Sequence, residues 1–168
     1  MKNGLETIVD DGSRILILGS LPGDTSLAAG RYYAHPRNRF WPILSRAYDE
    51  PIEADYRSRL LFLRRHRIAL WDVLKAAERR GSLDSNIRSP VVNDLAALIR
   101  NHGQIRAVGL NGAKAGSYFS RHWGQHSVFS SNDMRICRLP SSSSVPGRHV
   151  KSFEEKVQAW REFLNPVT

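Results

Sequence analysis

Residues 15–23 read ILILGSLPG, and residues 32–42 read YYAHPRNRFWP. The aliphatic run at the start is typical of a strand buried inside a parallel sheet, and the glycine and proline after it predict a tight turn. The second stretch brings two tyrosines, a histidine, two arginines and an asparagine into one short segment. In α/β proteins ligands bind beyond the carboxyl ends of parallel strands. Aromatic rings for stacking, cations for phosphate and an amide for holding water therefore favour a site for a nucleotide.

Both stretches resemble motifs of the uracil-DNA glycosylase superfamily. In that superfamily a strand enters a G-x-x-P-G-like loop, and a Phe/Tyr-Ala-His-Pro-x-Asn-x-Phe-Trp segment follows. Here residues 19–23 read GSLPG and residues 33–41 read YAHPRNRFW. Ser20 in the loop, together with residues 36–38, is most similar to the hypoxanthine-DNA glycosylase branch. The resemblance extends, in the family's order, over residues 15–45, 66–90, 105–116 and 134–150.

Strands that alternate with helices predict one α/β domain over residues 1–168, built on a parallel sheet. Buried strands are expected at residues 15–18, 68–73, 105–110 and 134–139. Helices are expected at residues 40–48, 56–66, 94–101 and 113–121, and after a capping box formed by Ser152 and Glu155. Residues 75–93 are expected to be irregular, with Asn93 as the cap of the next helix. The resemblance implies the same fold: three layers, α/β/α, around a short four-stranded parallel sheet.

The charge of the chain favours a polyanionic partner. Lys and Arg number 25 against 16 Asp and Glu, for a net charge of +9 and an isoelectric point near 10.3. Since cationic side chains that neutralise phosphates release counterions, we expect DNA as the partner. A solvated basic surface without such a partner is the alternative.

Cys137 is the only cysteine, so the chain has no internal disulfide and no four-cysteine zinc or iron–sulfur site. The six histidines show no metal-binding pattern, because Gly124 interrupts the spacing of His122 and His126. No apolar run has the length of a membrane span or the form of a signal peptide. We expect an intracellular, cytoplasmic protein with no metal, cofactor or membrane, and we expect it to be a monomer.

Asn38 is the candidate catalytic residue. Hydrolysis of an N-glycosidic bond needs a positioned water and a stabilised cationic sugar, and a neutral amide can hold that water without trapping the sugar covalently. The resemblance implies that Asn38 matches the water-positioning asparagine of the hypoxanthine-specific branch. On local sequence alone, a cap for the helix that begins near Phe40 is the simpler role, and one residue can fill both.

A second group of residues is expected to bind the base. The resemblance implies that Tyr33, just before Ala-His-Pro, stacks on a base that has left the duplex. Tyr32 is expected to pack in the core, because consecutive residues of an extended segment face opposite ways. The groups that could bond the base edge are the backbone of Gly19, Ser20 and Leu21 and the side chain of Asn111. For Asn111 a plain strand-to-helix turn is an equal alternative.

A third group is expected to contact DNA. Residues 139–149 read LPSSSSVPGRH and resemble the Pro/Ser loop with which the superfamily grips phosphates and wedges the duplex. A flexible serine loop is the alternative. The candidate DNA contacts are His35, Arg37, Ser141, Ser142, Ser143, Val145 and Arg148.

The interpretation that follows is a monofunctional DNA glycosylase that hydrolyses the bond to a deaminated base, hypoxanthine or uracil, and leaves an abasic site. The uracil-specific branch uses an aspartate in the loop that here reads GSLPG. Because that aspartate is missing, a non-catalytic binder of damaged or mismatched DNA is the alternative, while the charge disfavours a nucleoside hydrolase. Residues 80–87 also resemble the hypoxanthine-specific branch, where Ser85 or Asn86 could reach the base, or the segment could be a plain turn.

Overall fold

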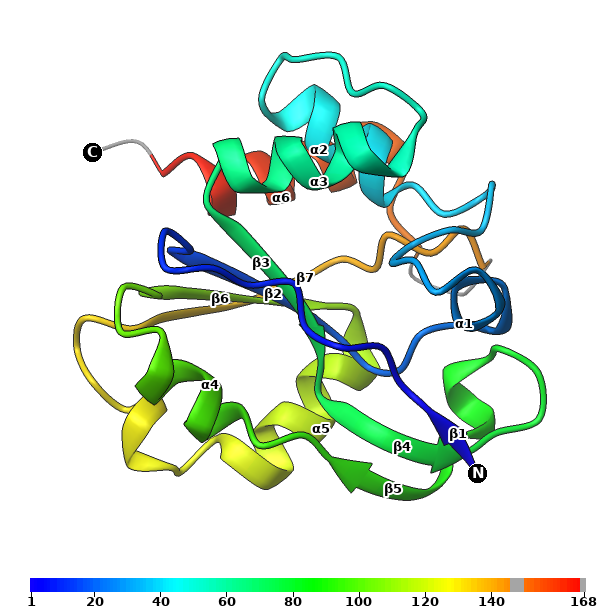
Figure 1. Ribbon diagram of the computed structural model, residues 1–168, viewed down its shortest axis with the longest axis vertical. Helices are drawn as coiled ribbons and strands as arrows, with labels where there is room; N and C mark the ends of the chain where they lie inside the picture. The colour runs from blue at the N-terminus through cyan, green and yellow to red at the C-terminus, as the bar shows by residue number, and fades with distance from the viewer. Residues whose placement is uncertain (146–149, 167–168) are drawn as a thin grey trace.

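The computed structural model describes residues 1–145 and 150–166. Its centre is a four-stranded sheet in the order β3-β2-β6-β7 (Figure 1). The strands are β2 (Ile15–Gly19), β3 (Ile68–Asp72), β6 (Ala107–Asn111) and β7 (Arg135–Leu139), and each neighbouring pair is parallel. The predicted short parallel sheet is therefore confirmed.

β2 lies between β3 and β6, so the aliphatic run that opens the motif has a paired strand along each edge. Leu16, Ile17 and Leu18 are fully buried. Gly19, the last residue of β2, pairs with Asp72, the last residue of β3. The carboxyl ends of the strands thus lie side by side, and the loops that follow them gather at one edge of the sheet, on the right in Figure 1.

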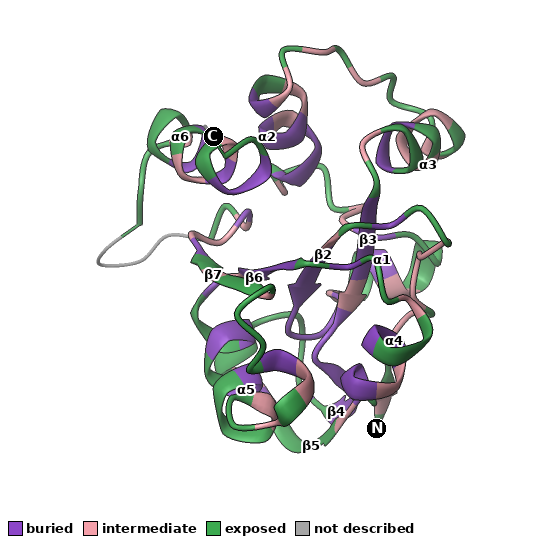
Figure 2. Cartoon of the chain, turned by 90° about the vertical axis from the view of Figure 1, so that its left-hand side faces the viewer, coloured by how far each residue is buried: buried purple, intermediate pink, exposed green. Residues whose placement is uncertain are grey.

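Helices cover both faces of the sheet and form the outer layers (Figures 1 and 2). One face carries α2 (Phe40–Ala47), α3 (Tyr56–Arg65) and α6 (Phe153–Leu164), and the other carries α4 (Leu95–Asn101) and α5 (Ala113–Trp123). The connections contain α1 (Asp24–Ala29) and two 3₁₀ turns, η1 (Asp84–Asn86) and η2 (Ser127–Phe129). Among the described helices, none has both the length and the apolar character that crossing a membrane requires.

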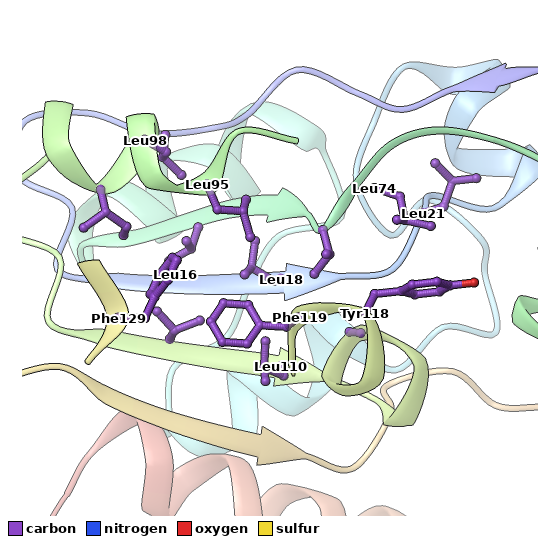
Figure 3. Packing of buried hydrophobic residues seen from close by; sticks show 14 of the residues in the cluster. Leu16, Leu18, Leu21, Leu74, Leu95, Leu98, Leu110, Tyr118, Phe119 and Phe129 are labelled. Atoms are coloured by element: carbon purple, nitrogen blue, oxygen red, sulfur yellow. The ribbon is translucent and has the colours of Figure 1, made fainter. Parts of the chain in front are cut away.

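A hydrophobic cluster fills the space on each side of the sheet. Leu18 of β2 and Phe119 of α5 belong to the cluster under α4 and α5 (Figure 3). Ile17, the neighbour of Leu18, points to the opposite cluster, which holds Phe40 and Trp160. The rings of Phe40 and Trp160 meet edge to face with centroids 5.8 Å apart. This alternation along β2 is the twofold side-chain period of a strand buried on both faces.

The two helix starts that were predicted from capping residues have different outcomes. α6 begins with the predicted capping box: Ser152 Oγ accepts from the Glu155 N–H, and the Glu155 carboxylate accepts from the Ser152 N–H. α4 is capped by Asp94, whose Oδ1 accepts from the Ala97 N–H at 3.0 Å, so the assignment of the cap to Asn93 is wrong. Asn93 is buried instead, because its side chain donates to the backbone carbonyl at the end of β3.

The expectation of an irregular segment over residues 75–93 is also wrong. β4 (Leu74–Glu78) and β5 (Arg88–Val92) pair antiparallel, and β1 (Lys2–Asn3) adds to the other side of β4. Register shifts interrupt the pairing, and β5 is almost wholly exposed and contains Pro90. A polar, proline-bearing edge strand lacks the apolar alternation that identifies a strand in a sequence.

Gly109, in the middle of β6, leaves room for side chains of α6 and β7. A Cβ there would lie 2.7 Å from the ring of Phe163 and 2.8 Å from Leu139, both of which are buried. Gly109→Ala should therefore lower the free energy of unfolding by about 1–3 kcal/mol, the usual range for overpacking a core. Urea denaturation measures this loss of stability. Gly103→Ala is the control, since nothing lies within 4 Å of a Cβ at Gly103. Equal stability of the two variants would contradict the close approach.

Candidate active site

A cavity of about 960 Å³ opens at the carboxyl ends of the parallel strands. Its walls are the loop after β2, the turn that holds Tyr33, η1, the start of α5 and the serine loop, here residues 140–145. Most of the predicted site residues line it: Gly19, Ser20, Leu21, Tyr33, His35, Asn38, Asn111, Ser141, Ser142, Ser143 and Val145. Arg37 is exposed and does not line the described part of the cavity, and Arg148 lies outside the described residues.

Ser142 joins three segments beside the cavity and is only 1% exposed. Its N–H donates to Asn111 Oδ1, and its Oγ accepts from Asn111 Nδ2, both at 2.9 Å. Its carbonyl accepts from the Arg39 N–H, also at 2.9 Å. These bonds attach the serine loop to the end of β6 and to the start of α2, so the described part of this loop is a hydrogen-bonded wall of the cavity.

Asn111 uses both of its N–H donors within the protein. Nδ2 donates to Ser142 Oγ and, at 3.2 Å, to the hydroxyl of Tyr33. Asn111 therefore orients the Tyr33 ring relative to the serine loop. If Asn111 also bonds the base edge, the remaining lone pair of Oδ1 is the acceptor available for it.

Tyr33 is an aromatic residue of the cavity wall, which Tyr32 also borders. Its ring stacks on Phe40 with centroids 3.9 Å apart and planes inclined by 17°. Burial raises the pKa of its hydroxyl, so the side chain stays neutral. Tyr32 is 4% exposed and packs in the core as expected, but the reason for expecting it is wrong. The segment is a turn, with a φ of 54° at Tyr33, and not an extended strand. The two rings therefore do not point in different directions because of the side-chain alternation of a strand.

Asn38 bonds the start of α2 and also lines the cavity. Its Oδ1 accepts from the Phe40 N–H at 2.9 Å, and its own N–H donates to the His35 carbonyl. Arg39 occupies the N-cap position without a side-chain bond of its own. The position of Asn38 is thus compatible with both roles considered for it, because the bond to Phe40 uses one lone pair of an amide that borders the cavity.

Two carboxyl groups that the sequence analysis did not place in the site border the same cavity. Asp72 ends β3 and is 4% exposed, and Asp84 opens η1 and accepts from Ser20 Oγ at 2.7 Å. Burial raises the pKa of Asp72 to about 7, with the charge of Asp84 adding to the rise and that of Arg79 opposing it. Burial also raises the pKa of Asp84, against the Ser20 hydrogen bond and the charges of Arg79 and Lys114. Two signals in the sequence pointed to them: Asp72 lies at the exit of a predicted strand, and Asp84 lies in the segment 80–87 that resembles the hypoxanthine-specific branch.

Arg79 holds the loop after β2 in place. It is 6% exposed, and its guanidinium donates to the carbonyls of Leu21, Pro22 and Gly81. These hydrogen bonds use the guanidinium to stabilise the loop. The positive charge of Arg79 also lowers the pKa values of Asp72 and Asp84.

Cations also border the serine loop. Lys156 is 6% exposed, and its Nζ donates to the Ser143 carbonyl at 3.0 Å. Arg138 and Lys151 line the cavity with it. Within residues 1–145 and 150–166, no group of three or more His, Cys, Asp or Glu side chains could hold a metal ion. The positive charge at this edge suits phosphate contacts.

Comparison with known proteins extends the resemblance beyond the two motifs. The chain matches the family model of the uracil DNA glycosylase superfamily over residues 7–164. It is 36% identical to a hypoxanthine DNA glycosylase of Methanosarcina acetivorans, over 95% of this chain and 97% of that protein. It is 40% identical to a hypoxanthine DNA glycosylase of Methanosarcina barkeri, over 70% of this chain and 75% of that protein. A solution NMR structure of a candidate uracil DNA glycosylase from M. acetivorans matches with a TM-score of 0.77 at 36% identity, over 97% of this chain and 98% of that one.

The buried carboxyl of Asp72 should make the stability of the protein depend on pH. Its pKa is raised from 3.8 to about 7, so in that interval the folded state keeps a proton that the unfolded state has released. The free energy of unfolding therefore falls as the pH rises through this interval. Asp72→Asn should remove this fall and be the more stable protein at pH 8, by at most about 4 kcal/mol at about 1.4 kcal/mol per pKa unit.

Urea denaturation at pH 5 and pH 8 measures this difference. Asp11→Asn is the control, because Asp11 is exposed and lies before the start of β2, whereas the cavity lies at the carboxyl end of that strand. If wild type and Asp72→Asn lose stability in parallel between the two pH values, the carboxyl is not the group that titrates.

Proposed function

The chain belongs to the uracil-DNA glycosylase superfamily, and from that premise we propose that it excises a deaminated base, hypoxanthine in particular, from DNA. The names of its two relatives, both hypoxanthine DNA glycosylases, support this substrate. The observation that carries the proposal is that Asn38, Tyr33 and the serine loop border one cavity at the carboxyl ends of the strands. One chain supplies all of these groups, which supports a monomer as the active form.

In the proposed reaction the target base leaves the duplex, enters the cavity and stacks on the face of Tyr33 that Phe40 does not cover. Asn38 holds a water molecule against C1′ of the sugar. The bond from C1′ to the base breaks with its electron pair on the base, and the base takes up a proton as it leaves. The water oxygen bonds to C1′, and the water releases one proton in exchange. A neutral amide stabilises the cationic sugar without bonding to it, so the products are the free base and an abasic site.

The rim of the cavity supplies the proposed contacts to the DNA backbone. His35 and Arg37 are exposed beside Asn38, as phosphate contacts require. Ser141 and Ser143 offer small hydroxyl groups near Lys156. Ser142, which the sequence analysis also placed among the DNA contacts, is 1% exposed and its hydroxyl already accepts from Asn111, so it supports the loop from inside. Val145 is 51% exposed at the end of the described part of this loop and is the apolar group for a wedge between bases. The net charge of +9 favours such a complex as a whole.

A non-catalytic DNA binder was the alternative that the missing aspartate suggested. The names of the relatives lend it no support. Asp72 at the end of β3 and Asp84 in η1 also bring carboxyl groups to the cavity. The cavity therefore contains carboxyl groups although the loop after β2 has no aspartate at the place where uracil-specific members have one.

The direct test is incubation with labelled duplexes that carry hypoxanthine, uracil, xanthine or a mismatched thymine, followed by alkaline cleavage of abasic sites. We expect strand cleavage at hypoxanthine. A protein that binds these duplexes and cleaves none of them would be the non-catalytic binder.

Asn38→Ala should slow single-turnover excision of hypoxanthine by at least about 100-fold, because the positioned water is lost. Binding to an undamaged duplex should change little. Asn38→Ser is the matched variant, since serine can still cap α2 at the Phe40 N–H but is too short to replace the amide. Wild-type rates in Asn38→Ser would restrict Asn38 to its capping role.

Tyr33→Ala should slow excision by roughly 10–100-fold, the rate equivalent of losing about 1–3 kcal/mol of stacking. The loss should be alike for every base that the enzyme excises, because a ring face reads no base edge. Tyr33→Phe keeps the ring and loses only the hydrogen bond from Asn111, so it should retain most of the activity. Single-turnover rates on hypoxanthine and uracil duplexes measure both effects. A variant that loses one base and keeps the other would show that Tyr33 reads an edge.

A further inference from the structure

A carboxyl group lies directly against the loop that lacks the aspartate of uracil-specific members. Asp72 pairs with Gly19 in the register of β2 and β3. A Cβ on Gly19 would lie 2.5 Å from Asp72 Oδ1 and 3.4 Å from the hydroxyl of Tyr33. Only a glycine at position 19 therefore leaves space for the Asp72 carboxyl beside the ring on which the base is proposed to stack.

No structural bond explains why the Asp72 carboxyl is buried. Its Oδ2 is closed to solvent and has no hydrogen-bond partner within the described residues. The hydrogen bond from Asn93 Nδ2, at 2.8 Å, is accepted by the backbone carbonyl of Asp72 and not by its carboxyl group. A buried carboxyl without partners destabilises a fold, so a role in the cavity that it lines accounts for its presence.

The surroundings of Asp72 favour its neutral form near neutral pH. Asp84 is more exposed and accepts the Ser20 hydroxyl, so it is the carboxyl of the pair that ionises first. Burial and the charge of Asp84 then oppose a second ionisation and raise the pKa of Asp72 to about 7. The other titratable groups that act on this pair are Tyr32 and Tyr33 from the turn after α1, Arg79 after β4 and Lys114 on α5.

We propose that the protonated Asp72 carboxyl donates its proton to N7 of a purine base as the glycosidic bond breaks. The inference rests on the proposed function. The Asp72 carboxyl and the Tyr33 hydroxyl meet at Gly19, and both residues line the cavity together with Asn38, so a base stacked on Tyr33 comes within reach of Asp72 while its sugar stays near Asn38. In hypoxanthine N1 carries a hydrogen, N9 carries the sugar and N3 lies beside the sugar. N7 is the ring lone pair that does not lie beside the sugar.

This transfer balances the hydrolysis. The electron pair of the C1′–N9 bond passes to the base, the Asp72 proton bonds to N7, and the base leaves as neutral hypoxanthine. The water held by Asn38 bonds to C1′ and gives up one proton, directly or through solvent, to the ionised Asp72. The enzyme returns to its starting protonation state. Because of the proton on N7, the base leaves as a neutral molecule and not as an anion.

The test is single-turnover excision from a duplex with one deoxyinosine, measured from pH 5.5 to 9. The wild-type rate should fall as the pH rises through about 7, approaching tenfold per pH unit, because the donor must be protonated. Asp72→Asn should be at least about 100-fold slower at pH 6 and should show no such fall. Asp84→Asn removes the neighbouring negative charge, so the fall should move to lower pH. Asp11→Asn, exposed and remote, should keep the wild-type profile.

A substrate pair keeps the test valid if a variant folds poorly. The wild-type protein should excise 3-deazahypoxanthine, which retains N7, and should excise 7-deazahypoxanthine at least about 100-fold more slowly. Equal rates on these two bases, or an unchanged pH profile in a folded Asp72→Asn, would overturn Asp72 as the proton donor. If wild type still excises hypoxanthine from the deoxyinosine duplex in those cases, the proposed glycosylase function stands and only the role of Asp72 is overturned. If wild type excises no base, the proposed function itself is overturned.

Discussion

The hydrogen bonds of Ser142 hold the cavity together. Through Asn111 they connect the serine loop to the end of β6, and through the Arg39 N–H they connect it to the start of α2. Asn111 in turn holds the hydroxyl of Tyr33, and Tyr33 stacks on Phe40 at the beginning of the same helix. The ring of Tyr33, the cap at Asn38 and the serine loop are therefore placed relative to one another by bonds that converge on one buried serine.

The opposite wall depends on a different constraint, the absence of a side chain at Gly19. That absence admits the Asp72 carboxyl between two parallel strands, where burial disfavours its charge. Asp84 and Arg79 surround it with one charge of each sign, so the carboxyl that lacks partners is the one that keeps its proton near neutral pH. The fold thereby accepts a destabilising group at the place where a leaving base would need a proton donor.

Much of this structure follows from the sequence. The aliphatic run of β2 and the capping box of α6 are local signals, and both predicted their elements correctly. β4 and β5 could not be recognised, because an exposed edge strand with a proline has no apolar period. Asp72 ends a predicted strand and Asp84 lies in an unassigned segment, and only the register of β2 with β3 and the folding of η1 over the loop bring them to one cavity. Long-range pairing of this kind has no signature within either segment.

If one cavity receives the base, with Tyr33 on its face and Asp72 beside its edge, a bound complex should show both contacts. A crystal structure of the protein with a duplex that carries a 2′-fluorinated deoxyinosine, which resists hydrolysis, would reveal them. We expect hypoxanthine outside the stack of the duplex, in van der Waals contact with the free face of Tyr33 and with N7 within hydrogen-bond distance of the Asp72 carboxyl. A base that stays in the duplex, or one that lies on another ring with Asp72 beyond reach, would contradict this expectation.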